Sequence, residues 1–355
     1  MNEPLAAGGA SSSDFRAIGV ALAQPPAPLA QSLKIVETAE AAGFDILGVG
    51  DLLADSLTYV GALTQRSRSA ELFTSVAGWT RTPVSLALSA LTAAELSGGR
   101  FRLGLGPMPQ AWSENWHGID YAQPIARMRD YVAAVRAACS TSLATPAGYA
   151  GTHYEFTEYT RLAGPGPHIP IYLGATRPGM TRLVGEVGDG LIVNAVHTVS
   201  WLRDVQLPAL AAGLDTAGRS RADVDVGALV LCAIDDNEAA AAELVRSALS
   251  FYFLAPYFQD ILEHHGFEHE LREGLAATQA GDRGAAARAV SDELLESVTV
   301  FGTPERVRQM LQRYRGLADW LLLSPPLTQN QDVARSQLER ILAELTPDRI
   351  RTQSR

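Results

Sequence analysis

Residues 170–194 read PIYLGATRPGMTRLVGEVGDGLIVN, and this stretch decides the predicted fold. The apolar run Ile171–Leu173 has no polar alternation, which is typical of a parallel strand buried on both faces. A helix pattern follows at Arg177–Val187, where Pro178 suits the first turn because its missing N–H group has no helical partner there. A second apolar run, Leu191–Val193, comes next. The stretch is therefore predicted to be a strand–helix–strand unit of a parallel sheet.

The same alternation of short apolar runs and longer amphipathic segments extends over most of the chain. The predicted strands are Ala17–Ala21, Ile46–Val49, Leu72–Val76, Arg102–Leu105, Ile171–Leu173, Leu191–Val193, Val226–Leu231 and Trp320–Leu323. The predicted helices are Leu29–Ala42, Pro83–Leu96, Pro124–Cys139, Arg177–Val187, Val199–Ala212, Asn237–Phe253 and Pro304–Arg315. Eight strands that alternate with helices favour an α/β fold closed into a (β/α)8 TIM barrel.

An open doubly wound sheet is the alternative fold for such an alternation. That fold predicts a glycine-rich dinucleotide fingerprint directly after the first strand. The segment Ala17–Pro26 contains only Gly19, and the glycine pairs farther along the chain lack a third glycine at the required spacing. The sequence therefore favours the barrel over the open sheet.

Composition limits the class of protein and its partners. The 355 residues carry 29 basic and 39 acidic side chains, a net charge of −10, with no basic block. We therefore expect neither nucleic-acid nor membrane binding. The two cysteines, Cys139 and Cys232, are too few for a disulfide framework and fit a reducing compartment, so the predicted location is cytoplasmic.

The chain is predicted to be a single barrel domain, residues 15–355, that follows a disordered tail, residues 1–14. The tail is rich in Ala, Gly and Ser and lacks the basic region and apolar core of a signal peptide. Two segments exceed a minimal barrel and are predicted insertions. Trp112–Tyr159 follows strand four and carries one helix. Phe251–Val298 follows strand seven, is helical and charged, and is expected to cover the barrel mouth or make a subunit contact.

The active sites of such barrels lie where the strands end and the next loops begin. The loop after strand five precedes a helix whose first N–H groups point outward and carry the positive end of the helix dipole, which suits a phosphate. Its residues are Gly174, Ala175, Thr176, Arg177, Pro178, Gly179 and Met180. Thr176 adds a hydroxyl donor and Arg177 a cation. The alternative is a tight turn that binds no ligand.

Asp51 follows strand two and is the acidic candidate at this end of the barrel. Its carboxylate would orient a polar ring edge or position a proton. The alternative role is to cap the next turn of chain, since Asp is favoured at helix N-termini. Trp112, Trp116 and His117, just beyond strand four, would wall a flat ring beside a substrate or pack on the barrel rim.

Other catalytic motifs give no support for a different chemistry. His265 and His269 lie one helical turn apart, a spacing that suits a metal, but their acidic neighbours favour a solvated charged helix, and no metal site is predicted. The sequence contains no GxSxG, Walker, HExxH or CxxC motif. Hydrolase and nucleotide triphosphatase activities therefore lack their usual signatures.

Taken together, several segments resemble the luciferase-like family of flavin- and deazaflavin-dependent enzymes, and are closest to its branch of coenzyme F420-dependent oxidoreductases. The resemblance runs from about Ile18 to Pro326. The matching stretches are SGGRFRLGLG (Ser97–Gly106), SENWHG (Ser113–Gly118), RMRDYVAAVR (Arg127–Arg136), PIYLGATRPGM (Pro170–Met180), GEVGDGLIVN (Gly185–Asn194), FGTPERV (Phe301–Val307) and LLLSPP (Leu321–Pro326).

The resemblance implies roles for these residues. The loop Gly174–Met180 matches the family's cofactor-phosphate loop, and Asp51 matches an acidic position beside the cofactor ring. Ser75 and Val76 resemble the family's non-prolyl cis bulge behind that ring. Three departures stand out. Leu52 replaces a histidine found in many relatives, Pro107–Pro109 replaces small polar residues, and Arg177 would favour extra phosphate or glutamate groups of the cofactor tail.

The resemblance implies hydride transfer between coenzyme F420 and a small organic substrate. Asp51, Glu114 and His117 are the catalytic candidates, and Gln110 is added to the cofactor-binding residues. Three readings stay open. A second assigns FMN to the same loop, with a partner flavin reductase and oxygen activation for monooxygenation. A third is a barrel without catalysis that binds a cofactor or partner. A homodimer is expected from the resemblance alone.

Overall fold

The structure is a computed structural model that describes residues 14–22, 29–51, 54–162, 166–328 and 330–353. Its barrel strands are β1 (Ala17–Ala21), β2 (Ile46–Val49), β3 (Glu71–Thr74), β5 (Phe101–Gly106), β8 (Ile171–Ala175), β9 (Gly190–Val193), β10 (Asp225–Ile234) and β12 (Trp320–Ser324). They are hydrogen-bonded in the order β10-β12-β1-β2-β3-β5-β8-β9, and β9 also pairs with β10. The sheet therefore closes on itself, which confirms the predicted (β/α)8 barrel.

Within this fold the chain groups into two compact units. In the described residues, unit 1 comprises 48–51, 54–162, 166–192 and 209–225. Unit 2 comprises 14–22, 29–47, 193–208, 226–328 and 330–353. The single domain that the sequence predicts stays a prediction, and all but the last residue of the predicted tail lies outside the described residues.

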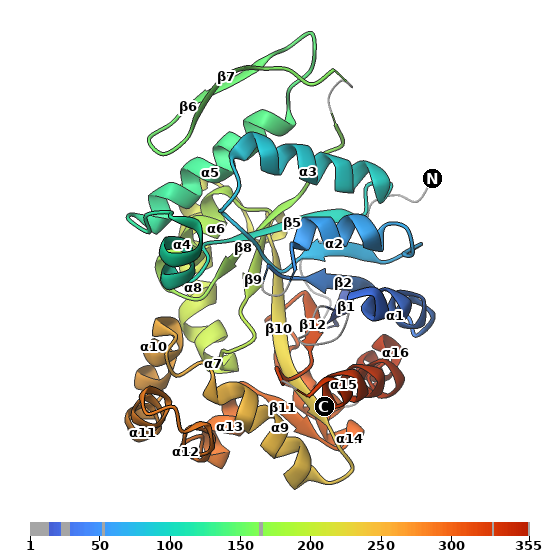
Figure 1. Cartoon of the computed structure of the whole chain (residues 1–355), viewed down its shortest axis with the longest axis vertical. Coiled ribbons are helices and arrows are strands. Elements are labelled where there is room, and N and C mark those ends of the chain that lie inside the picture. Colours follow the sequence, from blue (N-terminus) through green and yellow to red (C-terminus); the bar gives the residue numbers. More distant parts are fainter. Residues whose placement is uncertain (1–13, 23–28, 52–53, 163–165, 329, 354–355) are drawn as a thin grey trace. The chain divides into compact units, whose positions relative to one another are not determined.

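Unit 1 is built on parallel strands whose side chains are buried on both faces. Leu72 of β3 lies opposite Phe101 of β5, and Leu103 of β5 lies opposite Ile171 of β8. The helices of this unit include α2 (Ser56–Leu63), α3 (Pro83–Leu96), α5 (Pro124–Cys139) and α6 (Pro178–Val187). Helices α3 and α5 lie side by side (Figure 1).

In unit 1 one predicted strand has the wrong bounds and one helix was not predicted. The strand predicted at Leu72–Val76 ends at Thr74, and a short strand, β4 (Ala77–Gly78), resumes the pairing with β5. Helix α2 was not predicted from the sequence. It begins because Asp55 caps it, with the Asp55 carboxylate accepting a 2.7 Å hydrogen bond from the Thr58 N–H.

The insertion after strand four contains more structure than the single predicted helix. It begins with α4 (Gln110–His117), continues into α5, and ends in an antiparallel hairpin of β6 (Ala147–Ala150) and β7 (Glu155–Tyr159). The hairpin lies against α5 (Figure 1). Asp130 on α5 holds it there, because the Asp130 carboxylate accepts hydrogen bonds from the Tyr149 hydroxyl and the His153 N–H.

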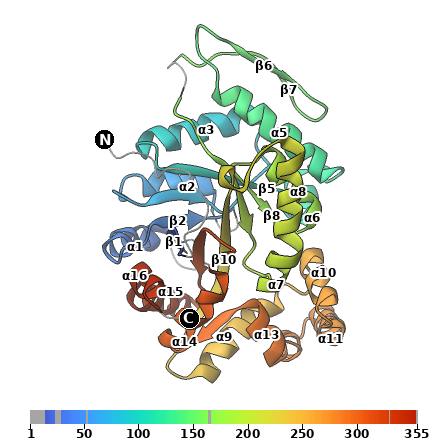
Figure 2. The same cartoon turned by 180° about the vertical axis from the view of Figure 1, so that it is seen from behind.

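Close helix packing explains two glycines of unit 1. Helix α6 lies beside α8 (Leu207–Ala217), as Figure 2 shows. A Cβ atom on Gly185 would lie 2.4 Å from the Leu210 carbonyl oxygen, and one on Gly213 would lie 2.0 Å from the Arg182 carbonyl oxygen. Only glycine permits this approach of the two backbones.

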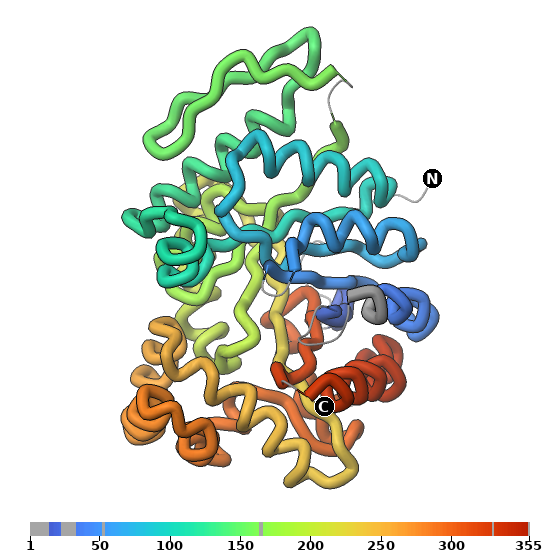
Figure 3. Tube along the Cα trace, viewed as in Figure 1, coloured from blue at the N-terminus to red at the C-terminus, as the bar shows by residue number. Residues whose placement is uncertain are grey.

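Unit 2 contains the parallel strands β1, β12, β10 and β11 (Val300–Gly302). A group of helices packs together and encloses an apolar cluster. Ile18 of β1 lies opposite Leu321 of β12. The helices are α9 (Glu238–Ser250), α10 (Pro256–His264), α11 (Glu268–Gln279), α12 (Arg283–Arg288) and α13 (Asp292–Val298), gold to orange in Figure 3. This confirms that the insertion Phe251–Val298 is helical. Phe253, Phe258 and Leu262 lie in the apolar cluster that this group buries.

The helix predicted at Val199–Ala212 is interrupted, which corrects the prediction. A short α-helical turn, α7 (Val199–Trp201), is followed by a π-helix, η1 (Leu202–Gln206), before α8 begins. Pro208 has no N–H group and cannot continue a regular ladder of hydrogen bonds. The Leu207 N–H, just before it, bonds to the Leu202 carbonyl oxygen five residues back.

The C-terminal part of unit 2 completes the chain. Helix α14 (Pro304–Leu311) is shorter than the predicted Pro304–Arg315, because its last turn tightens to a 3-10 helix at Gln312–Tyr314. Helices α1 (Leu29–Ala41), α15 (Gln331–Glu344) and α16 (Pro347–Arg351) are also in this unit. Across the described ranges, no helix is long and apolar enough to cross a bilayer.

Candidate functional site

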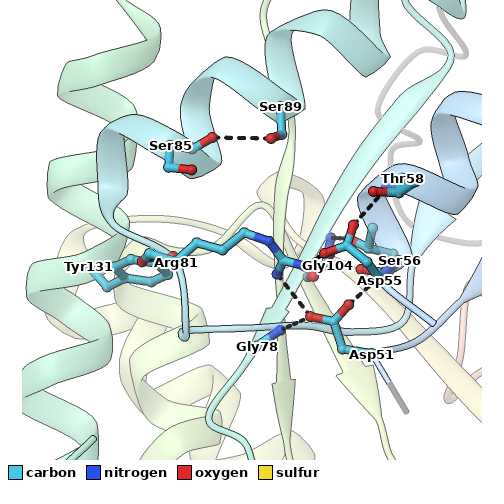
Figure 4. Close-up of polar contacts among 11 residues, drawn as sticks. Asp51, Asp55, Ser56, Thr58, Gly78, Arg81, Ser85, Ser89, Gly104 and Tyr131 are labelled. Carbon is cyan, nitrogen blue, oxygen red and sulfur yellow. Dashed lines mark hydrogen bonds and ion pairs between the residues drawn. The ribbon is translucent and has the colours of Figure 1, made fainter. Parts of the chain in front are cut away.

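Asp51 lies in unit 1, two residues after the end of β2, and both of its carboxylate oxygens accept hydrogen bonds. One oxygen accepts a 2.7 Å hydrogen bond from the Ser56 N–H. The other accepts 2.9 Å bonds from the Gly78 N–H and from Nη1 of Arg81 (Figure 4). The Asp51 side chain is 12% exposed. The N-cap of α2 is Asp55, so the capping role considered for Asp51 is wrong, although Asp51 accepts a bond from the Ser56 N–H. Its role beside a ring edge or a proton stays a prediction.

Arg81 joins two carboxylates, as Figure 4 shows. Its second terminal nitrogen pairs with Asp55, the residue that caps α2. Its carbonyl oxygen accepts a 2.9 Å hydrogen bond from the hydroxyl of Tyr131 on α5. The Arg81 guanidinium therefore links Asp51, after β2, to Asp55, at the start of α2. The backbone of Arg81 is hydrogen-bonded to Tyr131 on α5.

The hydrogen bonds around Asp51 hold it in its charged form. Burial alone would raise the pKa of this carboxyl, but the bonds from Arg81, Ser56 and Gly78 outweigh burial and lower the pKa below its usual value. Burial in the same way opposes the charge of Arg81, and the two carboxylates outweigh it and raise the pKa of the guanidinium. All three side chains, Asp51, Asp55 and Arg81, are therefore charged at neutral pH.

The Ser75–Val76 peptide bond is cis, as the resemblance implied. The Ser75 N–H bonds to the Val49 carbonyl oxygen at 2.7 Å, and the Asp51 N–H bonds to the Val76 carbonyl oxygen at 3.0 Å. The Val76 side chain packs against two glycines. A Cβ atom on Gly106 would lie 2.7 Å from Val76 Cγ2, and one on Gly174 would lie 3.2 Å from Val76 Cγ1.

The loop Gly174–Met180 therefore begins in contact with the cis bulge, and it ends in helix α6. Arg177 is the N-cap residue, and its side chain makes no capping hydrogen bond. Pro178 has no N–H group, and the Thr181 N–H bonds to the Arg177 carbonyl oxygen at 3.1 Å. The N–H groups of Gly179 and Met180 are therefore the first-turn donors that suit an anion. Ile125, at the start of α5, packs over Gly179, where an added Cβ would lie 2.7 Å from Ile125 Cδ1. This donor set fits a phosphate.

Helix α4 presents the remaining candidate residues on an exposed surface. Gln110 donates a 3.0 Å hydrogen bond to Glu114, and His117 is the last residue of the helix. In the part of the chain described, none of the three is hydrogen-bonded to Asp51 or to the bulge. Helix α4 instead contacts the residue after Gly78, because the buried Ser113 hydroxyl accepts a 3.3 Å bond from the Trp79 ring N–H.

Comparisons with known proteins identify the family. A model of the luciferase-like monooxygenases matches residues 11–319. The chain belongs to this family. It is 30% identical over 298 residues to 5,10-methylenetetrahydromethanopterin reductase of Methanolobus tindarius, covering 81% of this chain and 88% of the relative. It is also 30% identical over 322 residues to a putative coenzyme F420-dependent oxidoreductase of Mycobacterium tuberculosis, with the same coverage of 81% and 88%.

A solved structure supports the fold. The coenzyme F420-dependent tetrahydromethanopterin reductase of Methanopyrus kandleri superposes with a TM-score of 0.81 at 22% identity, covering 94% of this chain and 99% of that protein. These findings confirm the family resemblance drawn from the sequence, and with it the expectation of an oxidoreductase.

Met108 lies in the segment Pro107–Pro109, where the resemblance led us to expect small polar residues. Within Pro107–Pro109, the side chain of Met108 is 8% exposed and packs on Gly78. A Cβ atom on Gly78 would lie 2.5 Å from Met108 Cγ. The substitution therefore fills space beside the bulge with a flexible apolar side chain. Leu52, the second departure, lies outside the described residues.

Sequence reasoning missed Arg81, Asp55 and Tyr131. A signal for Arg81 was present, because it is the one arginine between the bulge and the next predicted helix. A buried carboxylate at a strand end requires hydrogen-bond donors or a cation nearby. Asp55 was harder to find, because the helix that it caps was itself not predicted.

His265 and His269, the histidines considered for a metal site, contact different parts of the chain. His265 makes a 2.8 Å hydrogen bond with the Thr198 hydroxyl, whereas His269 lies 3.4 Å from Glu273 on its own helix. In the ranges that the structure covers, no group of three or more His, Cys, Asp or Glu side chains is arranged to hold a metal ion.

Proposed function

We propose that this chain is an F420-dependent oxidoreductase that transfers a hydride between the deazaflavin and a small organic substrate. The observation that carries the proposal is the 30% identity, over four-fifths of the chain, to a protein named as a putative F420-dependent oxidoreductase. The site geometry supports a cofactor of this kind, because the cis bulge and the loop Gly174–Met180 meet at Val76.

The residues divide the work in the following way. Bound F420 supplies the hydride chemistry, and the protein supplies binding, orientation and electrostatics. The first-turn N–H groups of α6 and the cation of Arg177 would hold the phosphate. Ser75 and Val76 would support the ring, and Asp51 would lie near its edge. Gln110, Glu114 and His117 would face the substrate, and Glu114 or His117 would donate the proton.

Cofactor titration of the apoprotein tests this proposal. We expect F420 to bind with a change in its fluorescence, and FMN to bind far more weakly. Arg177→Gln should raise the Kd for F420 about tenfold, the loss of one charge-assisted contact worth about 1.4 kcal/mol. Arg182→Gln is the matched control, because Arg182 lies on the same helix, is exposed and pairs with Glu186. It should leave the Kd unchanged.

FMN-dependent monooxygenation is the second candidate, and the family description favours it. It would require reduced flavin from a partner reductase. Tight binding of FMN without binding of F420 would establish this candidate in place of the first. If neither cofactor bound at high concentration, a barrel without redox chemistry would be the remaining proposal.

We also propose an oligomeric state, a cellular location and a class of partner. We expect a homodimer in the cytoplasm with a small-molecule substrate and without nucleic-acid or membrane partners. Sedimentation of the purified protein tests the oligomeric state, and a monomer at micromolar concentration would contradict it.

A further inference from the structure

Asp51 holds the chain that leaves the cis bulge, on both sides of Ala77. Its backbone N–H donates to the Val76 carbonyl oxygen at 3.0 Å, on one side of the Ala77 residue that follows the bulge. Its carboxylate accepts from the Gly78 N–H at 2.9 Å, on the other side. One residue at the end of β2 thus fixes the chain from Val76 to Gly78, and a change in its side chain would release half of that hold.

Arg81 controls where the Asp51 carboxylate lies. It donates to the same oxygen of Asp51 that accepts from Gly78, at 2.9 Å, and its side chain is 17% exposed. Its second nitrogen is paired with Asp55, so the guanidinium is fixed at both ends of its fork. Arg81 lies three residues beyond Gly78, and the Tyr131 hydroxyl holds its carbonyl oxygen.

The bulge in turn contacts the predicted phosphate loop. Val76 packs on Gly174, the first residue of that loop, and on Gly106 at the end of β5. A shift of Val76 would therefore disturb the backbone where a cofactor ring and its phosphate are expected to be supported. The Asp51 carboxylate is hydrogen-bonded to this segment at Gly78, and Arg81 is hydrogen-bonded to that carboxylate.

We propose that Arg81 and Asp51 form a positioning pair that fixes the Ser75–Val76 bulge for the cofactor ring. Neither residue needs to touch the substrate in this role. The pair acts through the backbone of residues 76–78, and Asp55 serves to hold the outer end of the Arg81 guanidinium. The inference rests on the proposed function for the identity of the ring, and the position of the bulge is measured separately.

Hydrogen exchange measures the bulge without any cofactor. In the apoprotein, Arg81→Met should increase amide exchange in the peptide spanning residues 71–81 severalfold. Arg246→Met is the matched control. Arg246 also bridges two carboxylates, with 3.0 Å to Glu243 and 2.6 Å to Asp292, and is 13% exposed. The control should leave exchange in residues 71–81 unchanged. Unchanged exchange in Arg81→Met would overturn the inference.

Cofactor binding measures the consequence for the ring. Arg81→Met should raise the Kd for F420 about tenfold or more, and at saturation the circular dichroism of the bound deazaflavin should differ from that of wild type. Arg246→Met should match wild type in both. Arg81→Lys should recover part of the affinity, because an ammonium retains the charge without the two-pronged fork. An Arg81→Met protein with the affinity and ring signal of wild type would also overturn the inference.

Thermal unfolding of each variant separates positioning from a failure to fold, and Arg81→Lys supplies a folded variant if Arg81→Met does not fold. A wild-type protein that binds neither F420 nor FMN would contradict the proposed function alone. The exchange measurement in that case still decides whether Arg81 and Asp51 fix the bulge.

Discussion

Asp51 in unit 1 is half-buried and His197 in unit 2 is buried, and both follow a barrel strand, yet the protein keeps Asp51 charged and His197 neutral. Three donors surround the Asp51 carboxylate, and its pKa is lowered. His197 is 2% exposed, and its Nδ1 donates a 2.6 Å hydrogen bond to the Asn194 carbonyl oxygen. Its Nε2 has no partner in the described part of the chain.

The difference lies in what surrounds each group. Burial lowers the pKa of His197 to about 4, the bond to Asn194 opposes this, and the positive charge of Arg313 adds to the lowering. The ring of Tyr314 lies beside the imidazole, with the centroids 5.6 Å apart. A buried group stays charged where donors converge on it and becomes neutral where they do not. Position after a strand does not by itself decide a residue's charge.

Of the substitutions that test this comparison, removal of the Asp51 carboxylate should lower the free energy of unfolding most. Asp51→Ala leaves the N–H groups of Ser56 and Gly78 without their acceptor and Arg81 with one carboxylate. We expect the free energy of unfolding to fall by about 3 kcal/mol or more at neutral pH. His197→Ala, which removes one hydrogen bond and some packing, should cost less, about 2 kcal/mol. Urea unfolding of both variants measures the order, and the reverse order would contradict the account of Asp51.

The pH dependence of stability should separate the two residues more finely. His197 has a lower pKa in the folded than in the unfolded state, so between pH 6.5 and about 4 the unfolded chain binds more protons. Stability is fully present above pH 6.5 and should decline by about 3 kcal/mol as the pH falls through this window. Asp51, with a lowered pKa, keeps its contribution above 3.8 and loses it only below that value.

His197→Asn tests this assignment. Its amide nitrogen can take the place of Nδ1 and donate to the Asn194 carbonyl oxygen, but it does not titrate. The variant should lose most of the decline in the free energy of unfolding between pH 6.5 and 4.5, measured by urea unfolding at several pH values, and the lowered pKa of His265 should account for a smaller remaining slope. Asp51→Asn is the control and should keep the wild-type slope in that range. A wild-type slope in His197→Asn would assign the pH dependence to other groups.

The same contrast explains how much of the molecule the sequence predicts. The strands were predictable because β1 and β2 are apolar runs whose burial is a local property of sequence, and their predicted bounds agree with the structure. Helices α3 and α5 were predictable because each begins at a proline and ends within two residues of a polar or glycine stop. The π-helix η1 was not predictable from periodicity, because it depends on which carbonyl the chain reaches before Pro208.

The site was predictable in part for a related reason. Asp51 and the loop Gly174–Met180 follow strands, so their place at the carboxyl end of the sheet follows from strand assignment alone. Arg81 bonds with Asp51 across 30 residues of sequence, and no local pattern contains that contact. The state of His197 likewise depends on Tyr314 and Arg313, which are far from it in the chain.

Substitution of Asp55 should lower the free energy of unfolding least. The size of this decrease shows which of the two carboxylates around Arg81 contributes more to stability. Its side chain is 45% exposed, so its ion pair with Arg81 is screened by solvent, and such pairs contribute about 0–1 kcal/mol. Asparagine caps helices as well as aspartate does, so Asp55→Asn should retain the bond from the Thr58 N–H. We expect urea unfolding to show a loss of less than about 1 kcal/mol. A loss as large as that of Asp51→Ala would place the stabilising contact at the exposed end of the Arg81 fork instead, and the bulge would then depend on α2 more than on β2.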